Sequence, residues 1–207
     1  MDDLISQIEK LKISDIKSII DQRIEEFTKF QNEHINRIFR ELCFCIMTAN
    51  CPADRCIEIH ETIGEDFLTL SEEELSATFK DLGYRFPNVR ANYITESRNY
   101  IKPLEDALIS LKGDELRSWV VKNIKGLGYK ESSHFLRNIG YKDYAIVDFH
   151  IVDLLERHKL VKRPKTMTKK KYLQIEEVLK ELGETLELNM GELDLYLWYL
   201  ETGKILK

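Results

Sequence analysis

The sequence predicts an all-α protein. Apolar residues recur at three- and four-residue spacing along most of the chain, which places them on one face of a helix. Glycine (9 residues) and proline (4 residues) are scarce, which argues against a protein built from many strands and tight turns. We find no run of alternating apolar residues and no internal repeat, so no segment indicates a sheet or a solenoid.

The first part of the chain contains three helical patterns. Ile5, Ile8 and Leu11 predict one helix, and the isoleucines between residues 13 and 20 predict a second, with Ser14 as a candidate N-cap. A long apolar stripe over residues 35–47 predicts a third helix, which stops at Asn50-Cys51-Pro52. This third helix is apolar on most faces, as a central buried helix would be.

Helix-end signals organise the middle of the chain. Ser71 with Glu74 fits a capping box that opens a helix, and a helix is expected to close at Gly83. The segment Arg85-Phe86-Pro87-Asn88 is expected to be a loop, because proline disfavours helix at the residue before it. Further helices are predicted at about 89–101, 103–110, 114–124, 130–139, 149–158, 168–182 and 190–202.

Four cysteines fall within a short apolar stretch, at Cys43, Cys45, Cys51 and Cys56. Their spacing matches neither the usual iron–sulfur runs nor the paired C-x2-C elements of zinc sites. We expect reduced structural thiols and no metal site.

Charge is segregated along the chain, although the net charge is only −5. Residues 58–81 hold eight acids against one lysine, whereas residues 157–171 hold eight Lys/Arg and no acid. A second basic block, residues 117–142, holds six Lys/Arg and one acid. Solvated helix faces explain any one such run. Two basic blocks around one short motif favour a surface for nucleic acid.

The most informative segment surrounds the sequence Ile124-Lys125-Gly126-Leu127-Gly128-Tyr129-Lys130. It predicts two short helices joined by a tight turn, in which Gly126 and Gly128 allow positive φ and close backbone approach. The N–H groups of such a turn, with the positive end of the next helix, can hold a DNA phosphate without reading sequence. Many such turns merely join helices.

A second element is Val147-Asp148-Phe149-His150, whose Asp148 lies eighteen residues after Lys130. Asp148 precedes an apolar helical run and is well placed as an N-cap. Taken in isolation, Asp148 is explained as a cap and Lys130 as a surface lysine.

Together, and at this spacing, the two elements resemble the helix-hairpin-helix base-excision DNA glycosylases. In that superfamily a hairpin L-x-G-[LIV]-G-x-K leads to a V-D-x-H element. The resemblance covers the chain from about Phe39 to its end. It implies one domain, 1–207, made of two helical subdomains (approximately 30–115 and 1–29 plus 116–207), with the helix-hairpin-helix at 115–139.

Two upstream segments support the resemblance. Leu82-Gly83-Tyr84-Arg85, with Arg90 and Tyr93, is similar to the loop that wedges into the duplex. Residues 41–50 are similar to the buried helix and loop that face the estranged strand.

Within the superfamily the chain resembles the compact archaeal 8-oxoguanine DNA glycosylases of the second type. It is short, and it lacks both the four-cysteine cluster of endonuclease III relatives and an N-terminal β-domain. Its C-terminal segment, Leu195 to Lys207, is also similar to theirs. The resemblance places the terminal lysine, Lys207, and its carboxylate in the lesion pocket.

The chemistry expected from this resemblance needs two residues. A carboxylate such as Asp148 stabilises the positive charge that develops at C1′ when an N-glycosidic bond breaks. A desolvated lysine can lose its proton and attack C1′, so Lys130 predicts a Schiff base and a bifunctional glycosylase and lyase. Strand cleavage 3′ to the lesion follows by β-elimination.

Other residues are expected to bind the DNA. The lesion-base pocket is expected to contain Lys207, Trp198 and Phe86, with Trp198 as a wall on which the base stacks. Trp198 and Phe86 are equally compatible with plain core positions. His150 is expected to orient Asp148 or touch a phosphate, and Asn50 to face the opposite base. The complete set of expected DNA-binding residues is Gly126, Gly128, Tyr129, His150, Tyr84, Arg85 and Asn50.

The expected partner is double-stranded DNA containing 8-oxoguanine, bound by a monomer. No cofactor is required by the chemistry, and the resemblance implies a monovalent cation (Na⁺ or K⁺) at the hairpin carbonyls. With no apolar run of membrane-spanning length and no signal peptide, the expected location is cytoplasmic, on the nucleoid.

Two alternatives stay open at this point. The hairpin is shared by glycosylases for other lesions, such as oxidised pyrimidines or mismatched adenine. A non-catalytic helix-hairpin-helix DNA-binding module is the other, but it would tolerate any residue at positions 130 and 148. A helical scaffold with no DNA role is the least favoured.

Overall fold

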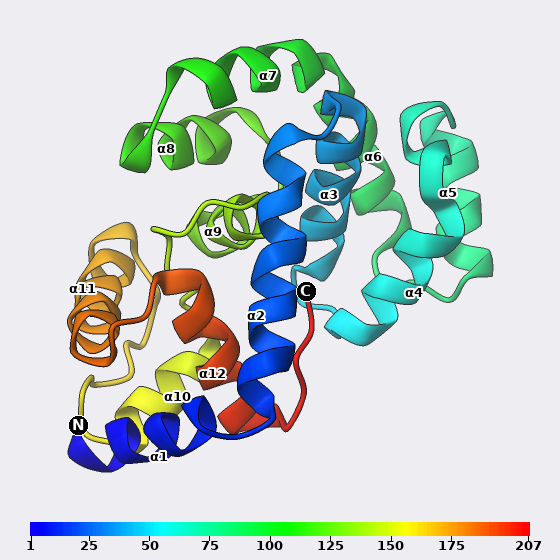
Figure 1. Cartoon of the computed structure of the whole chain (residues 1–207). Coiled ribbons are helices and arrows are strands. Elements are labelled where there is room, and N and C mark those ends of the chain that lie inside the picture. Colours follow the sequence, from blue (N-terminus) through cyan, green and yellow to red (C-terminus); the bar gives the residue numbers. More distant parts are fainter. The chain divides into compact units, whose positions relative to one another are not determined.

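The computed structural model describes all residues, Met1–Lys207, and confirms the all-α prediction (Figure 1). It contains twelve α-helices and three short 3-10 helices, and no strand. The chain forms two compact units, Met1–Gln31 with Leu136–Lys207, and Asn32–Phe135. None of the helices has the length and apolar character that crossing a bilayer requires.

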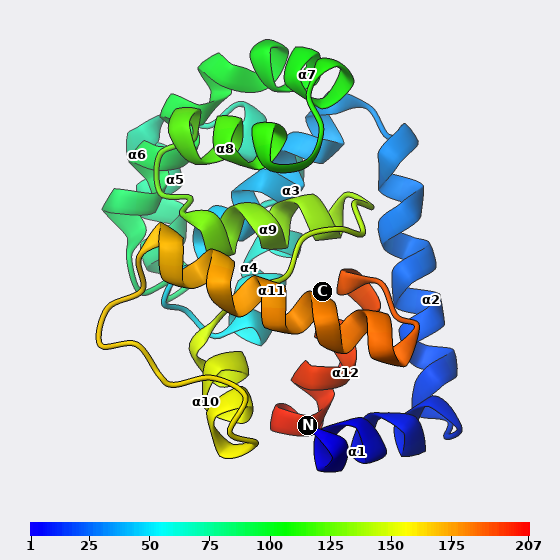
Figure 2. The same cartoon turned by 90° about the vertical axis from the view of Figure 1, so that its left-hand side faces the viewer.

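The first unit is built around α12. This helix packs against four others, α1, α2, α10 and α11 (Figures 1 and 2). It buries Leu193, Leu195, Tyr196 and Leu197, so its sequence lacks a polar face over the middle turns. The helices of this unit are α1 (Asp2–Lys12), α2 (Ile16–Lys29), α10 (Phe149–Arg157), α11 (Lys169–Leu186) and α12 (Met190–Thr202), together with the last residues of α9 (Tyr129–Asn138).

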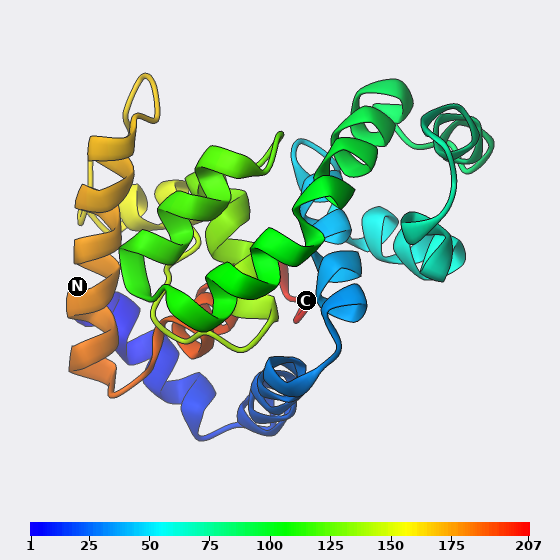
Figure 3. The same ribbon diagram turned by 90° about the horizontal axis from the view of Figure 1, so that it is seen from above.

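The second unit is built around α3, the apolar helix predicted to be central. Every residue of Ile38–Thr48 except Arg40 is buried, and the helix packs against α4, α6, α7 and η2. The helices α5 and α6 form a neighbouring pair (cyan to green in Figure 3). The elements of this unit are α3 (Ile35–Thr48), α4 (Ala53–Ile63), η2 (Gly64–Leu68), α5 (Glu72–Asp81), α6 (Pro87–Ser97), η3 (Arg98–Tyr100), α7 (Ile101–Ser110) and α8 (Gly113–Asn123), with α9 up to Phe135; η1 (Phe30–Asn32) lies at the boundary.

The chain crosses from one unit to the other at two boundaries, and one of them differs from the expected subdomains. The first boundary lies within two residues of the expected position, 29/30. The second boundary lies at 135/136 rather than at the expected 115/116. The reason is that α8 packs against α7, and Arg117 of α8 donates a hydrogen bond to Ser133 of α9. The turn between α8 and α9 therefore belongs to the second unit.

Local signals placed most helix ends correctly. The Ser71 capping box is present, with Glu74 N donating to Ser71 Oγ (3.2 Å) and Ser71 N donating to Glu74 Oε2 (2.8 Å). Gly83 follows α5 with φ +68°. Two expectations were wrong: α2 is preceded by Asp15 rather than Ser14 as its cap residue, and α6 begins at Pro87, because proline is favoured at the first helical position. The helix α4 had not been predicted.

Candidate DNA-binding and catalytic site

The hairpin between α8 and α9 is held by short backbone hydrogen bonds. Ile124 N donates to Val120 O (2.9 Å), and Leu127 N donates to Ile124 O (3.3 Å). Gly126 has φ +88°, and a Cβ there would lie 2.4 Å from Cδ2 of Tyr93. Glycine is therefore required at position 126 both for its backbone conformation and for the close approach of α6.

Gly128 departs from the expectation. Its φ is not positive, and a Cβ at this position would lie 3.4 Å from Glu131 Oε2. Its carbonyl accepts the N–H of Ser132 (3.0 Å), an early bond of α9. The predicted left-handed conformation is thus confirmed for Gly126 and wrong for Gly128, whose small size leaves the backbone at the start of α9 open to solvent.

A Gly126→Ala substitution is expected to lower stability by more than about 1 kcal/mol, since it adds a clash to left-handed strain. Displacing Tyr93 should also weaken binding of a DNA duplex. Gly113→Ala is the matched control, because Gly113 has φ +53° but no atom within 4 Å of its would-be Cβ. Urea unfolding and duplex affinity measure both effects. Equal losses in the two variants would contradict a special role for the close approach.

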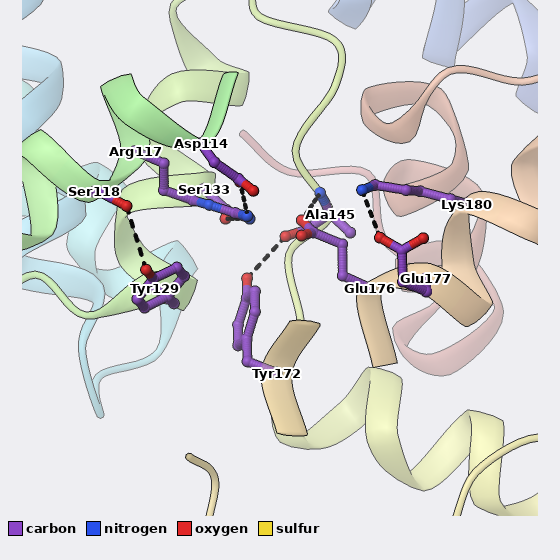
Figure 4. A network of polar contacts seen from close by, with 10 residues as sticks. All are labelled: Asp114, Arg117, Ser118, Tyr129, Ser133, Ala145, Tyr172, Glu176, Glu177 and Lys180. Atoms are coloured by element: carbon purple, nitrogen blue, oxygen red, sulfur yellow. Dashed lines mark hydrogen bonds and ion pairs between the residues drawn. The ribbon is translucent and has the colours of Figure 1, made fainter. Parts of the chain in front are cut away.

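A buried arginine braces the hairpin from inside. Arg117 is 1% exposed, and its guanidinium donates to Asp114 Oδ1 (2.6 Å) and to Ser133 Oγ (3.2 Å). It also lies 5.2 Å from the ring centroid of Tyr129, whose hydroxyl is 3.4 Å from Ser118 Oγ (Figure 4). Tyr129 was expected to bind DNA, but its ring and hydroxyl contact residues of α8 and so link α8 to α9. The sequence indicated Arg117 only as one charge of a basic block.

Lys130 is the second residue of α9. Its side chain is 27% exposed, and Nζ lies 3.8 Å from Glu131 Oε1. Its charge also acts on Cys56: burial raises the pKa of that thiol to about 12, while the positive charges of Lys130 and Arg90 oppose the rise. The Lys130 side chain is therefore accessible from solvent.

The loop before α6 brings three predicted residues together. The guanidinium of Arg85 lies 5.0 Å from the ring centroid of Phe86, and its Nη1 donates to Asn50 O (3.4 Å). Arg85 and Asn50 are exposed, and Asn50 has φ +62°, which asparagine tolerates. Phe86 is half-buried at the N-cap of α6. Arg85 and Asn50 thus form a single exposed edge.

Tyr84 is not a wedge. It is 5% exposed, its hydroxyl donates to Met47 O (2.6 Å), and its ring packs 4.8 Å from that of Phe79. Burial raises the pKa of the Tyr84 hydroxyl well above its usual range, with the neighbouring Cys51 adding to the shift. An aromatic ring that has found a buried acceptor for its hydroxyl is a core residue, so the structure contradicts this assignment.

Two residues of the same loop region tie α6 to the hairpin. Arg90 is buried and donates to Ala49 O (2.8 Å), at the start of the loop that holds Asn50. The ring centroid of Tyr93 lies 5.6 Å from the guanidinium carbon of Arg90 and 5.5 Å from Lys125 Nζ, and the ring lies against Gly126. The exposed edge and the hairpin are therefore mechanically connected within the second unit.

Asp148 has the predicted capping role, within the first unit. Its Oδ1 accepts the N–H of Ile151 (2.9 Å) at the start of α10. The carboxylate is partly exposed, and a cap uses one of its oxygens. Since capping fixes the side chain, Asp148 combines a structural role with a carboxylate held in one orientation.

The segment that leads to Asp148 is held by α11. Tyr172 Oη donates to Ala145 O (2.8 Å) and accepts the N–H of Val147 (3.2 Å). Glu176, one turn later, accepts the N–H of Ala145 (3.2 Å; Figure 4). Tyr172 and Glu176 are both buried. These two positioning residues were not predicted, because nothing local in the sequence links residues 172–176 to residues 145–147.

His150 and Trp198, both expected near the lesion, are neighbours in the first unit. Their ring centroids lie 5.1 Å apart in an edge-to-face arrangement, and Phe149, which is 62% exposed, lies 4.0 Å from His150. The Nε1–H of Trp198 is buried and has no acceptor in the protein. A buried indole N–H without an acceptor is costly, and the assignment of Trp198 to the lesion pocket stays a prediction.

Lys207 is partly buried, like Ile205 and Leu206 before it. The three terminal residues are thus not fully exposed to solvent. This position is compatible with a terminal carboxylate and side chain that take part in a site.

The four cysteines form no disulfide, and three of them are buried. Burial also raises the pKa of Cys43 far above its usual range, which keeps that thiol protonated and unreactive. No group of three or more His, Cys, Asp or Glu side chains is arranged to hold a metal ion.

The chain is all-α and has a tight hairpin turn that requires a glycine. A lysine stands at the start of the hairpin's second helix, and an aspartate that caps a helix follows further along the chain. These features define the helix-hairpin-helix class of DNA glycosylases. A family model described as 8-oxoguanine DNA glycosylase matches residues 20–188. The chain belongs to this family.

Full-length relatives support the assignment. The 8-oxoguanine DNA glycosylase/AP lyase of Methanocaldococcus jannaschii is 50% identical over 206 residues, covering 99% of both chains, and that of Korarchaeum cryptofilum is 46% identical over 209 residues, covering 100% of this chain and 99% of the other. A crystal structure of the M. jannaschii enzyme with a 15mer DNA containing 8-oxoguanine superposes with a TM-score of 0.96 at 48% identity, over 99% of both chains. The Thermotoga maritima enzyme gives a TM-score of 0.93 at 38% identity, over 100% of this chain and 99% of that one.

Proposed function

We propose that this protein removes 8-oxoguanine from double-stranded DNA and then cuts the strand 3′ to the lesion through a Schiff base on Lys130. The observation that carries this function is the accessible lysine at the start of α9, directly after the hairpin turn. A glycosylase that used only an aspartate would activate water and stop at an abasic site. The 8-oxoguanine DNA glycosylase/AP lyases of M. jannaschii and K. cryptofilum, which match along their full lengths, support the same substrate and both activities.

The first step exchanges one bond at C1′ for another. The unprotonated Nζ of Lys130 attacks C1′ as the bond from C1′ to N9 of the base breaks, and the bonding electrons leave with the base, which then takes up a proton. Positive charge develops on the sugar during this exchange, and the fixed carboxylate of Asp148 stabilises it. The bonded Nζ, now positively charged, first gives up one proton, which balances the proton that the base takes up. The nitrogen electron pair then opens the C1′–O4′ bond, O4′ takes a proton from water, and an iminium remains between Nζ and C1′.

The second step cuts the strand. The iminium withdraws electrons from C2′, so a proton leaves C2′ and the electron pair expels the 3′ phosphate as the C3′–O3′ bond breaks. Water finally hydrolyses the iminium and returns Lys130 to its amine. No oxidant, reductant or organic cofactor enters this sequence.

DNA binding uses groups that do not read base sequence. The backbone N–H groups near Gly126 and Gly128 suit a phosphate, and the positive end of α9 adds to the attraction. The edge formed by Arg85 and Asn50 is exposed and polar, as required to fill the space that a flipped nucleotide leaves and to meet the opposite base. The enzyme therefore acts where chromosomal DNA lies, which we propose is the cytoplasm and its nucleoid.

Base recognition is assigned to the first unit. 8-Oxoguanine differs from guanine by an N7–H donor and the O8 acceptor. The terminal carboxylate of Lys207 can accept from N7–H, and the unmet Nε1–H of Trp198 is a donor for an oxygen of the base. His150, at the edge of the Trp198 ring, adds a third polar group.

Changing the chain end should impair excision selectively. Deleting Lys207, or appending residues after it, is expected to slow single-turnover excision of 8-oxoguanine about 10- to 100-fold, the cost of one lost hydrogen bond to a charged group. Lys204→Gln is the control, since it removes a nearby charge without moving the terminal carboxylate. Binding of undamaged duplex should keep its salt dependence. Equal rates for the native, deleted and extended ends would remove Lys207 from the site.

A monovalent cation at the hairpin is part of the same proposal. The donor set consists of backbone carbonyls of the turn, the hard oxygen ligands that Na⁺ or K⁺ accepts. The turn also borders a hollow of about 480 Å³, lined by residues 121–128 with Glu96, Ser97 and Tyr100. The residues present thus fit such an ion, which would supply a positive charge between the hairpin and a phosphate.

Borohydride trapping on a panel of lesion duplexes tests the function as a whole. The expected result is a covalent enzyme–DNA adduct with 8-oxoguanine and much less with oxidised pyrimidines or mismatched adenine. Trapping that prefers one of those lesions would overturn the substrate assignment, and binding without any excision would reduce the protein to a DNA-binding module.

A further inference from the structure

Lys130 has an acidic neighbour in the first turn of α9. Oε1 of Glu131 lies 3.8 Å from Lys130 Nζ, and the Glu131 side chain is 18% exposed. Oε2 of the same carboxylate lies beside Gly128, 3.4 Å from the place that a Cβ there would occupy. The Glu131 carboxylate is therefore close both to the hairpin turn and to the reactive amine, and all three residues belong to the second unit.

Helix geometry alone does not bring these two side chains together. Residues i and i+1 of an α-helix point about 100° apart, and the usual ion pairs form at i and i+3 or i+4. The pair of Lys180 with Glu177 in α11 follows that rule. An acid in the first turn suits the N-terminal end of a helix, which explains a carboxylate at position 131 but not its approach to Nζ. The approach needs a second explanation, which the chemistry of the amine supplies.

The proposed reaction releases a proton from Lys130 that needs an acceptor. When Nζ bonds to C1′ it becomes positively charged, and it must lose a proton before its electron pair can open the sugar ring. Asp148 is a poor acceptor, because a proton on its carboxylate would remove the charge that stabilises the sugar. A second base close to Nζ leaves Asp148 ionised throughout the step.

We propose that Glu131 is a third catalytic residue, the base that accepts the proton from Lys130 Nζ once Nζ has bonded to C1′. The N–H bond breaks, an O–H bond forms on Glu131, and the electron pair stays on Nζ. Glu131 then passes the proton to water, which also supplies the proton that O4′ takes up. The separation of 3.8 Å exceeds a hydrogen bond, and such contacts often tighten when substrate binds. This inference rests on the proposed function, since it concerns one step of that reaction.

The test makes the same chemical change at two first-turn acids. Glu131→Gln keeps the size of the side chain but removes the base, so single-turnover excision of 8-oxoguanine should fall about 100-fold, the lower end of what one general base contributes. Glu131→Asp keeps a carboxylate and should recover most of that rate. Glu73→Gln is the control, because Glu73 is an exposed acid in the first turn of α5, and it should excise at the wild-type rate.

Three further measurements distinguish this role from a structural one. Affinity of Glu131→Gln for undamaged duplex should be unchanged or higher, since a negative charge is lost beside the hairpin, whereas a distorted hairpin would bind more weakly. Thermal unfolding of Glu131→Gln should match that of Glu73→Gln, because each variant loses one acid from a helix N-terminus. Borohydride trapping on a duplex with a preformed abasic site should also be slow, because attack at C1′ again leaves a charged Nζ.

The results decide this inference separately from the proposed function. Excision by Glu131→Gln at the rate of Glu73→Gln would overturn the role of Glu131. Faster excision would overturn it too, because the carboxylate would then only hold Nζ in its protonated, unreactive form. A Glu131→Asp variant as slow as Glu131→Gln would do the same, since the loss would follow side-chain shape rather than the carboxylate. A wild type that does not excise 8-oxoguanine would overturn the proposed function, while trapping on the abasic duplex would still decide whether Glu131 assists Lys130.

Discussion

Lys130→Gln is expected to abolish borohydride trapping on DNA that contains 8-oxoguanine. Glutamine is close in size but has no nucleophilic amine, and loss of an activated nucleophile costs on the order of 10³-fold or more in rate. Duplex binding should survive, because the hairpin contacts phosphate through its backbone. Trapping, excision and duplex affinity are measured on the same preparation.

Two further variants separate nucleophilicity from charge. Lys130→Arg keeps the positive charge but cannot supply a free amine, so it should also fail to trap. Lys125→Gln removes a charge from the hairpin turn, where that lysine pairs with Glu96 (3.0 Å), and should still trap. Wild-type trapping by Lys130→Gln would show that another amine forms the Schiff base.

Asp148→Asn is expected to slow base excision about 100- to 1,000-fold, the range seen when one electrostatic stabiliser of a transition state is removed. Stability should change little, because asparagine caps a helix about as well as aspartate. Asp148→Ala should lose the same activity and, in addition, about 1 kcal/mol of stability through loss of the bond to Ile151 N. Single-turnover excision and urea unfolding measure the two effects separately.

Asp153→Asn provides the matched control on α10. It makes the same chemical change one turn further along the helix, where the carboxylate pairs with Arg163. Its excision rate should stay near the wild-type rate. If Asp148→Asn excises as fast as this control, Asp148 is a cap and nothing more.

Local signals explain which parts of the fold were predictable. The Ser71 capping box, the glycine after α5 and the Asp148 cap each involve residues within a few positions, so spacing alone reveals them. The same holds for the hairpin, where the closely spaced glycines mark the turn. The apolar stripe of α3 was also informative, because a helix buried on most faces has little choice of environment.

Predictions failed where a residue type fits two environments. Tyr84 and Arg85 are adjacent in one loop, yet Tyr84 is buried with its hydroxyl on Met47 O while Arg85 is exposed. Gly128 shares its motif with Gly126 but not its backbone conformation. Arg117 and the pair Tyr172 and Glu176 could not be recognised, because their partners are distant in sequence and are defined only by packing.

The way α11 holds residues 145–147 bears on the engineering of this site. An extended segment usually obtains its hydrogen bonds from a neighbouring strand, but here two side chains spaced i and i+4 on a helix satisfy three backbone groups. One face of α11 thus takes the place of the neighbouring strand that would otherwise bond to residues 145–147. Transplanting the reactive carboxylate into another helical scaffold therefore requires moving two pieces of chain: the loop that ends at Asp148, and a facing helix with a phenol and a carboxylate one turn apart.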